Sequence, residues 1–500
     1  MAISQCRRCG TEISYDFEIT IPSSPALELL QSGVVPDPST ALLIKDLLVN
    51  ARVTLCSVNH EIEKISKFLS YLREKSEALE DTISQHAQSL TPIRRIPDDI
   101  LSEIFSLVLH PYSEINARSG PLLFSRVCRA WRQCAQTSQR IWASFGVSSN
   151  QAPTSTIVRS WLSHARSIPL SPHIHLEVTP SDARRAWPAI AEVIAYCDRW
   201  QNLVITSPIS VLRSFNSVQG RLPSLEYLSI KLHANESHHQ CIEAFVLAPR
   251  LRRLHQQITG VLSQIRLPWG QLTHLELDIE CDYDRLRFME ESLLSTFQEL
   301  VGLIDLSLTC NCECRERRDI PLIPVTLHHL QYLKIVLPDL MGDIFEMIRC
   351  PALKSISIEQ ADIYWTYRPF LSFLGTLSSL ESITICLMSL GDPDEPPDLI
   401  PTLRAVPTVK YLWINSMDAD IPDRLLHSMT CPANGPYLLP ALRELDIDAT
   451  MSDLLFIDVV KSRINGNGRL AQLKRVWYRS TRDDEIAWIS TLPRGIVRPK

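Results

Sequence analysis

The 14 cysteines of the chain are its most obvious source of chemistry, because thiolates bind metals and take part in redox reactions. Cys6 and Cys9 have the spacing of half a structural zinc site, and Cys310, Cys312 and Cys314 form a dense cluster. A structural zinc ion needs four ligands, and no second pair lies near Cys6 and Cys9 in the sequence. Alternate side chains of an extended segment point apart, so the second cluster is poorly arranged for one ion. We therefore predict no metal site and no cofactor.

Other residue patterns that often mark catalysis are also incomplete. His60-Glu61 lacks the second histidine of a zinc protease, and His238-His239 is a lone pair in a polar segment. The sequence has no G-x-S-x-G, P-loop or G-x-G-x-x-G motif, and it has only 15 glycines. An enzyme in the C-terminal half would need paired titratable residues, and none stand out. We therefore predict that the chain is not an enzyme.

Charge and hydropathy exclude further classes of protein. Lys and Arg total 50 and Asp and Glu total 56, so the formal net charge is −6. This balance excludes a strongly basic nucleic-acid-binding protein, and no nucleic-acid partner is expected. There is no run of 18 apolar residues, and the first residues lack the apolar core of a secretory signal, so no membrane partner is expected. We predict a location in the cytoplasm and/or nucleus, where cysteines stay reduced.

The first element that could position a binding site is a long helix. Residues 48–90 contain neither Gly nor Pro, and two apolar series recur with a spacing of seven. Eleven of the 13 positions are apolar, with Ser76 and His86 as the exceptions: Leu48, Ala51, Leu55, Val58, Ile62, Ile65, Leu69, Leu72, Leu79, Ile83 and Leu90. This heptad pattern predicts a coiled coil over 41–91, and the β-branched residues favour a parallel homodimer. The alternative is an amphipathic helix that lies on the rest of the chain.

A group of short helices is expected after the break at Pro92. Pro97 precedes two acidic residues and an apolar helical face, and Gly120-Pro121 opens a second helix that should run through Trp131. A third helix is expected over 133–141. Three helices in about 50 residues have little core, so they should present an apolar face to a partner.

The segment 93–145 resembles an F-box. The pattern of that family is an apolar–Pro pair, an acidic residue two places later, apolar helix positions, a Val-Cys-x-x-Trp core and a closing Trp. The matching residues are Ile96, Pro97, Asp99, Ile100, Leu101, Ile104, Phe105, Val127, Cys128, Trp131 and Trp142. Ile96 replaces the usual Leu, Asp99 replaces the usual Glu, and the connection around 110–120 is longer than in the family.

The upstream layout also resembles the large F-box families of mushroom-forming fungi, in which a Ser-Pro-x-x-x-Leu-Leu segment, here residues 24–30, precedes a coiled coil. The resemblance implies that the F-box residues bind the Skp adaptor of a cullin–RING ubiquitin ligase. Pro97, Leu101, Ile104 and Trp131 should carry much of this binding. Changing Pro97 and Leu101 together to Ala should abolish it without unfolding the chain.

The rest of the chain repeats an apolar-x-x-apolar-x-apolar motif. Nine intact copies and one partial copy, which starts at Leu251, are present; the intact ones start at Leu225, Leu272, Leu303, Leu330, Leu353, Leu380, Val409, Leu442 and Leu473. Successive copies lie 21–33 residues apart, and their last apolar positions alternate with other residues as in a strand. The intervals hold helix- or turn-length segments such as 292–299 and 340–348.

This periodicity predicts an α/β solenoid, an irregular leucine-rich-repeat horseshoe, over 201–480. Residues 148–200 would form a connector and capping unit, 1–40 a flexible N-terminal segment and 481–500 a C-terminal tail. The repeats lack the Asn or Cys that usually follows the strand, and their spacing is uneven. The alternative is an α/β domain with a parallel sheet, which has the same strand–helix alternation.

Strand positions that alternate with the buried leucines should line the concave side of the solenoid. Five of them are aromatic and are suitable anchors for a protein ligand: Tyr227, Tyr332, Tyr411, Trp413 and Trp477. The alternative is that a neighbouring loop covers Trp413 and Trp477.

These features together predict a non-catalytic substrate receptor of an SCF-type ubiquitin ligase. The F-box would bind the adaptor, and through it the cullin and RING subunits, while the repeats would bind a target protein. Binding would raise the effective concentration of target lysines near the conjugating enzyme. The alternative is an interaction scaffold that acts through the coiled coil and the repeats without ubiquitin transfer. Adaptor binding distinguishes the two.

Overall fold

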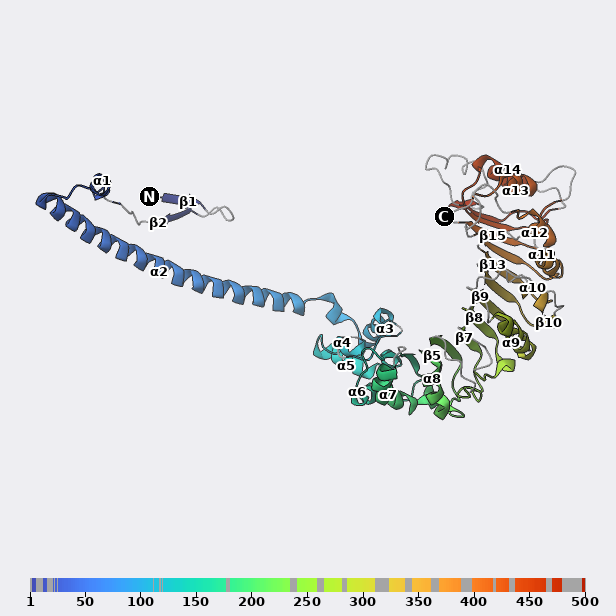
Figure 1. The fold of residues 1–500 in the computed structure, drawn as a ribbon. Helices are drawn as coiled ribbons and strands as arrows, with labels where there is room; N and C mark the ends of the chain where they lie inside the picture. Colours follow the sequence, from blue (N-terminus) through green and yellow to red (C-terminus); the bar gives the residue numbers. More distant parts are fainter. Residues whose placement is uncertain are drawn as a thin grey trace. The chain divides into compact units, whose positions relative to one another are not determined.

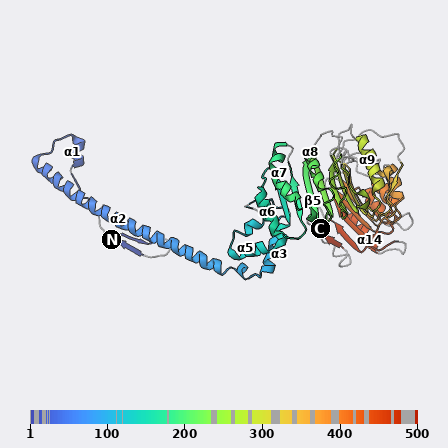
Figure 2. The same cartoon turned by 90° about the horizontal axis from the view of Figure 1, so that it is seen from below.

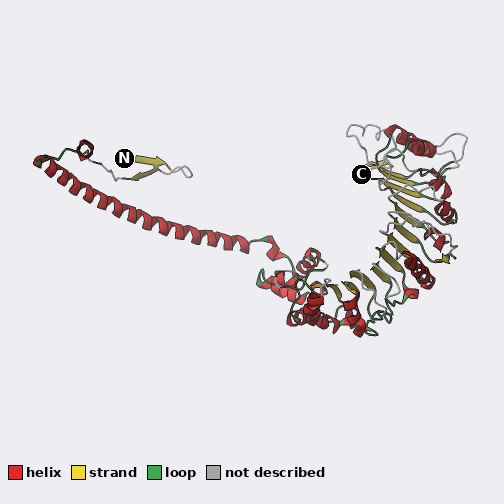
Figure 3. Ribbon diagram, in the orientation of Figure 1, coloured by secondary structure: helices red, strands yellow, loops and turns green. Residues whose placement is uncertain are grey.

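The chain divides into two compact units, residues 1–97 and 98–500. Unit 1 is mainly helical, whereas unit 2 combines helices with a long parallel sheet (Figures 1 and 3). The computed structural model describes residues 2–5, 12–15, 21, 23–24, 26–110, 112–116, 118, 120–176, 180–233, 241–258, 265–280, 286–310, 323–337, 344–360, 368–387, 398–416, 420–430, 437–464, 470–478 and 497–499.

Unit 1 contains a small antiparallel hairpin followed by helices. Its elements are β1 (Ala2–Gln5), β2 (Glu12–Tyr15), α1 (Ala26–Ser32), α2 (Pro38–Ser89) and the 3-10 helix η1 (Pro92–Arg95). α2 begins where the Asp37 carboxylate accepts a hydrogen bond of 3.0 Å from the Thr40 N–H. Pro38 stands in its first turn, where a missing N–H costs nothing.

The heptad seam of α2 is exposed. The helix has 52 residues and is about 78 Å long, and none of its residues is buried. Leu55, Ile62 and Leu79 on the seam are 59%, 56% and 63% exposed. The helix starts at Pro38, three residues before the predicted range, so the heptad pattern continues upstream through Ala41 and Ile44.

Unit 2 opens with four short helical segments. They are α3 (Asp98–Val108), α4 (Pro121–Phe124), α5 (Arg129–Thr137) and the 3-10 helix η2 (Gln139–Trp142). The expectation of one helix from Gly120 through Trp131 is wrong, because α4 ends at Phe124. Cys128 is extended there, and its thiol caps α5 by accepting the Trp131 N–H.

Gly120 is required at the start of α4. Its φ is +61°, a conformation that costs little only for glycine. A Cβ at this position would lie 2.8 Å from the Trp161 ring. The turn into α4 and the packing of Trp161 therefore both depend on the absence of a side chain.

One sheet of 14 strands dominates unit 2. All neighbouring strands pair parallel, and they lie in sequence order. The strands are β3 (Ser144–Ser148), β4 (Ser171–His175), β5 (Asn202–Pro208), β6 (Tyr227–His233), β7 (Arg253–Ile258), β8 (His274–Ile279), β9 (Asp305–Cys310), β11 (Tyr332–Leu337), β13 (Ser355–Gln360), β14 (Ser382–Leu387), β15 (Tyr411–Ser416), β16 (Glu444–Asp448), β17 (Arg475–Tyr478) and β18 (Val497–Pro499). A separate parallel pair joins β10 (Val325–Thr326) to β12 (Ile348–Arg349).

The connecting helices of unit 2 lie on the outer side of the curved sheet (Figures 1 and 2). They are α6 (Ser155–His164), α7 (Pro180–Ile194), α8 (Ile209–Leu212), α9 (Leu286–Glu299), α10 (Ile344–Met347), α11 (Arg368–Gly375), α12 (Ile400–Ala405), α13 (Asp423–Met429) and α14 (Asp453–Ile464), with the 3-10 helices η3 (Cys197–Arg199), η4 (Arg213–Val218) and η6 (Trp269–Gln271). This arrangement confirms the predicted α/β solenoid. The expected helical segment 292–299 lies within α9, whereas within 340–348 only Ile344–Met347 is helical and 340–343 lies outside the described residues.

The core is a set of ladders of apolar side chains that run from strand to strand. The first residue of every predicted copy, from Leu225 to Leu473, is at most 1% exposed. The next two positions are also buried in nearly every strand, for example Leu333 and Ile335 of β11. β7 departs from the pattern, because Gln256 takes the last position and its buried Oε1 has no hydrogen-bond partner. Burial of equivalent residues against one another is what joins the repeats.

The sheet extends beyond the predicted array on both sides. It begins at Ser144, so the expected connector 148–200 starts at the last residue of β3 and contains β4. At the other end β18 lies in the expected tail, and it pairs with β17. Two early strands fit the same apolar spacing with a tryptophan in its first position: Trp142, Phe145 and Val147 at β3, and Trp200, Leu203 and Ile205 at β5, are all buried. The predicted array, whose first copy starts at Leu225, omits both.

A buried arginine ties the last helices to the sheet. Arg463 of α14 is 1% exposed, and its guanidinium donates to the carbonyls of Met429, Leu438 and Leu439. Leu439 has a positive φ of 51°, so this strained turn is held by the guanidinium from α14. The cation thus satisfies the carbonyl groups at the end of α13 and in the turn that precedes β16.

Leu333→Asp should unfold much of the solenoid. Leu333 is 2% exposed in the centre of the ladder. A buried unpaired carboxylate there should lower the free energy of unfolding by about 3 kcal/mol or more. Tyr332→Asp is the matched control, because Tyr332 is its neighbour on the same strand and is 49% exposed. Limited proteolysis and denaturant unfolding measure the effect, and loss of protection in β11 alone would contradict a continuous core.

Candidate functional site

The face of the sheet opposite the outer helices presents rows of side chains. Because the strands pair in register, equivalent positions stand side by side, about 4.8 Å apart. The first row contains Tyr227, Arg253, His274, Asp305, Tyr332, Ser355, Ser382, Tyr411, Glu444 and Arg475. The second row contains Ser229, His255, Glu276, Ser307, Lys334, Ser357, Thr384, Trp413, Asp446 and Trp477. We call these rows the concave face.

The five predicted aromatic anchors all lie on the concave face, but they do not form one cluster. Tyr227, Tyr332 and Tyr411 belong to the first row, and Trp413 and Trp477 belong to the second. Tyr332 stands three strands from Tyr411, which is about 14 Å at the usual strand spacing. Tyr332, Tyr411 and Trp413 are 49%, 41% and 41% exposed, so Trp413 is not covered by a loop. Tyr227 and Trp477 are half-buried.

The C-terminal end of the concave face combines aromatic and charged side chains. Tyr411 and Trp413 of β15 face Glu444 and Asp446 of β16 in register. Glu444 in turn lies 3.5 Å from the guanidinium of Arg475. Flat, partly exposed aromatic rings beside fixed charges are typical of protein-binding surfaces.

A strip of small hydroxyl side chains separates this end from Tyr332. Ser355 and Ser357 of β13 and Ser382 and Thr384 of β14 occupy both rows between Tyr332 and Tyr411. Small side chains let a ligand approach the sheet closely. The strip and the aromatic residues on its two sides together form a surface about four strands wide.

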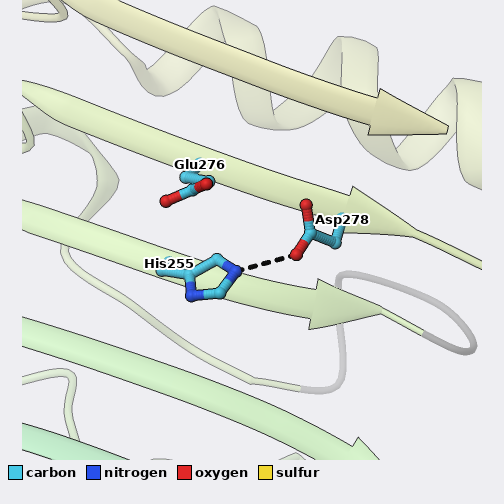
Figure 4. A group of neighbouring side chains, drawn as sticks. All are labelled: His255, Glu276 and Asp278. Carbon is cyan, nitrogen blue, oxygen red and sulfur yellow. Dashed lines mark hydrogen bonds and ion pairs between the residues drawn. The ribbon is translucent and has the colours of Figure 1, made fainter. Parts of the chain in front are cut away.

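The N-terminal end of the concave face holds a polar network that crosses three strands. The guanidinium of Arg253 stacks on the Tyr227 ring at 5.5 Å, and burial raises the pKa of the Tyr227 phenol. On the second row, His255 Nδ1 lies 3.1 Å from Ser229 Oγ, and His255 Nε2 lies 2.9 Å from Asp278 Oδ2 (Figure 4). Glu276 stands directly opposite His255 in register.

Within the described residues, His255, Glu276 and Asp278 are also the one group of three side chains whose ligand atoms could meet on a metal ion. These atoms lie within 4.8 Å of one another. Both ring nitrogens of His255 are already engaged, so a cation would have to displace the bond to Asp278. The network can therefore fix the His255 ring and join β6, β7 and β8 without an ion.

The sequence patterns missed this network. Gln256 breaks the motif in the partial copy at Leu251, although simple alternation from Leu254 still places His255 on the opposite face of the strand. The contact with Asp278 depends on the register between β7 and β8. His255 and Asp278 are 23 residues apart in the sequence, so no local sequence pattern predicts that register.

The predicted adaptor-binding residues divide into buried and exposed groups. Leu101, Phe105 and Trp142 are 3%, 1% and 2% exposed, so they form the core of the helical segment. Phe105 stacks on Phe124 with ring centroids 4.1 Å apart, and the Trp131 ring lies 5.0 Å from Phe105. These side chains hold α3, α4 and α5 together.

The exposed group forms an apolar stripe on α3 with further residues near α4. Ile100, Leu107 and Val108 are 53%, 78% and 67% exposed, and Ile104 is half-buried on the same stripe. Leu123 and Val127 are 51% and 57% exposed. Side chains of this kind are available to a partner.

The remaining predicted residues of this segment are polar, half-buried or in unit 1. Asp98 and Asp99 stand in the first turn of α3, where their negative charge interacts favourably with the positive end of the helix dipole. Ile96 is half-buried and Pro97 is exposed, and both belong to unit 1. Cys128 and Trp131 are half-buried.

The expectation that changing Pro97 and Leu101 together to Ala leaves the fold intact is therefore corrected at Leu101. Leu101 is a core residue, and truncating a buried leucine costs about 2–5 kcal/mol of stability. The apolar residues of α3 form two adjacent stripes along the helix, one buried and one exposed. The sequence alone does not say which stripe faces inward.

Trp142 joins the helical segment to the solenoid. Its ring packs against Trp161 at 4.9 Å and stacks on His164 at 4.4 Å, and its Nε1 donates to the Ala135 carbonyl at 2.7 Å. The Trp161 Nε1 donates to the Trp142 carbonyl. Through these contacts α5, η2 and α6 form one core, which places the helical segment and the concave face in a single compact unit.

One cysteine of the two sequence clusters lies within the described residues. Cys310 is buried on β9, whereas Cys6, Cys9, Cys312 and Cys314 lie outside the described residues, as do His238 and His239. His60 lies on α2. Burial raises the pKa of the Cys350 thiol to about 12, which keeps it protonated and unreactive at neutral pH.

A scan against protein-family models finds no matching family, and a search of curated proteins finds no similar sequence. Among the helices of the described segments, none combines the length and the apolarity needed to cross a membrane.

Truncation separates core residues from surface residues among the predicted positions. Trp142→Ala should lower the free energy of unfolding by about 3–5 kcal/mol, because it leaves a large cavity and an unpaired carbonyl. Trp413→Ala should lower it by less than about 1 kcal/mol, because this ring is 41% exposed. Urea unfolding followed by circular dichroism measures both, and equal losses would mean that Trp413 is a structural residue.

Proposed function

We propose that the chain is a non-catalytic substrate receptor of an SCF-type cullin–RING ubiquitin ligase. In this proposal residues 93–145 act as an F-box that binds the Skp adaptor, and the solenoid is an irregular leucine-rich-repeat array whose concave face binds a target protein. The observation that carries the proposal is the α3 segment: an exposed apolar stripe backed by the stacked core of Phe105, Phe124 and Trp131. Such a stripe on a three-helix segment supports docking on another protein.

The packing between the helical segment and the solenoid explains how the proposed receptor would work. The helical segment and the concave face share one compact unit, and the packing of Trp142 against Trp161 connects them. A target on the concave face would therefore keep a defined distance and orientation from the adaptor. Restricting the search of a target lysine in this way raises its effective concentration at the conjugating enzyme.

The target surface proposed is the C-terminal part of the concave face. Tyr332, Tyr411 and Trp413 would act as anchors beside the strip of hydroxyl side chains, and Tyr227 and Trp477 would contribute less because they are half-buried. The charges of Glu444 and Arg475 would select among ligands by complementarity.

The scaffold alternative uses the same surfaces without the adaptor. The exposed seam of α2 supports it, since that seam offers a second binding surface that does not involve the F-box. Adaptor binding separates the two functions, because a scaffold without ubiquitin transfer has no need of the α3 stripe.

Direct binding to the purified Skp adaptor tests the proposal. The full chain should retain adaptor at micromolar concentration, and Ile100→Asp with Val127→Asp should weaken binding about a hundredfold or more by placing charges in an apolar interface. Both side chains are more than half exposed, so circular dichroism should stay unchanged. Val301→Asp is the matched control, because Val301 is 69% exposed in the solenoid. A wild-type chain that fails to bind adaptor would exclude the ligase function.

A further inference from the structure

The seam of α2 has no cover within the described part of unit 1. α1 is seven residues long, about 10 Å, and contains no buried residue, whereas α2 is about 78 Å long. Seam residues such as Leu48, Ile65 and Leu72 are 45–47% exposed. A narrow stripe with a strict seven-residue repeat fits another helix of the same kind, because each apolar residue can enter a hole between four residues of its partner.

We infer that α2 binds the α2 of a second copy of this chain in an antiparallel coiled coil, centred on Lys67. In heptad notation, the series that starts at Leu48 occupies the a positions and the series that starts at Ala51 occupies the d positions. The g position is the residue before each a, and the e position is the residue after each d. In the antiparallel arrangement each a residue faces a d residue, so Ile62 of one copy meets Leu72 of the other. This inference concerns assembly and is independent of the proposed function.

Packing at the seam does not by itself select an orientation. Parallel dimers favour β-branched residues at a and leucine at d. Within residues 48–90 the β-branched residues divide evenly, with Ile62 and Ile83 at a and Val58 and Ile65 at d. Ile62 and Ile65, which beside several leucines favour a parallel dimer at first sight, belong to different series.

The charged side chains that border the seam favour the antiparallel arrangement. With the two helices centred on Lys67, Glu61 at g faces Lys75 of the second copy, and Arg52 at e faces Glu80. Symmetry makes each pair occur twice, and no like charges meet at the e and g positions of residues 48–90. Glu61 also pairs with Lys64 of its own helix at 2.7 Å, so the second cation adds to an existing contact.

The parallel arrangement offers fewer charge pairs. Each g residue would then face the e residue of the next heptad in the second copy. Lys75 would face Glu80, but Glu61 would face Ser66 and Arg73 would face Phe68. The parallel dimer has one kind of attractive pair, whereas the antiparallel dimer has two. Charge complementarity therefore favours the antiparallel dimer.

Sedimentation of the full chain at tens of micromolar tests the second copy. The wild type should be a dimer, and Ile62→Asp should be a monomer at the same concentration. Val53→Asp is the matched control: Val53 is 65% exposed on the outer face of the same helix, and Ile62 is 56% exposed on the seam. The control should remain a dimer. A monomeric wild type, or loss of the dimer in both variants, would overturn the inference.

Charge reversal tests the orientation. Lys75→Glu in the wild-type chain should raise the dissociation constant about tenfold, because two attractive pairs become repulsive. In a chain that carries Glu61→Lys, the same Lys75→Glu change should lower the dissociation constant, since it restores the opposite-charge pair. A parallel dimer predicts weakening in both backgrounds, because Lys75 then faces Glu80 in each, and that result would overturn the antiparallel assignment.

Cross-linking provides a direct readout of the facing residues. In a chain with Ile62→Cys and Leu72→Cys, oxidation should join Cys at 62 of one copy to Cys at 72 of the other, as identified by mass spectrometry of the linked peptides. Within one helix the two positions are about 15 Å apart and cannot bond. Links between equivalent positions, 62 to 62 and 72 to 72, would instead show a parallel dimer.

Discussion

Burial of each apolar strand residue against its equivalent in the next strand is the constraint on which unit 2 depends. Because the parallel strands lie in sequence order and such crossovers are right-handed, the connections return along the same face of the sheet. The return segments carry the outer helices, and the opposite face is left with the alternating side chains. The ladders from Leu225 to Leu473 thus determine both the position of the helices and the composition of the concave face.

The same constraint integrates the helical segment at the start of unit 2. β3 follows directly after Trp142, and the bridge between Glu114 and Gly146 adds the long loop before α4 to the first strand. Gly146 has a neighbouring carbonyl 3.0 Å from where its Cβ would stand, so this loop lies flat on the strand. The helices are therefore an extension of the first repeat, and their geometry relative to the concave face is set by packing.

The repeating strands could be predicted because each copy carries its own local signal. Leu-x-x-Leu-x-Leu or a close apolar variant reports burial and alternation within six residues, and the nine strands that carry the intact copies follow it. Where a tryptophan takes the first position, as Trp142 and Trp200 do, the leucine signal is lost although the spacing and the burial are the same. Gln256 shows that even a polar side chain can occupy a ladder position when its neighbours form the strand around it.

The functional surfaces were harder to predict for two different reasons. On α3, Ile100 and Leu101 are adjacent apolar residues of similar size, and only the packing of Phe105 on Phe124 decides that Leu101 faces inward. On the concave face, the Ser229–His255–Asp278 network joins three strands whose register depends on the whole stack. Local periodicity identifies a surface, whereas tertiary contacts decide which of its residues are available.

The uneven spacing of the repeats affects how the sequence of this protein can evolve. Successive strands start 21–33 residues apart along the chain, yet they pair as immediate neighbours, so all of the difference in length falls in the connections between the strands. An insertion or deletion in an outer segment alters neither the spacing nor the register of the concave rows. Substitutions on the concave face can in turn alter ligand preference without disturbing the ladders. The architecture therefore separates tolerance to length variation from diversification of the binding surface.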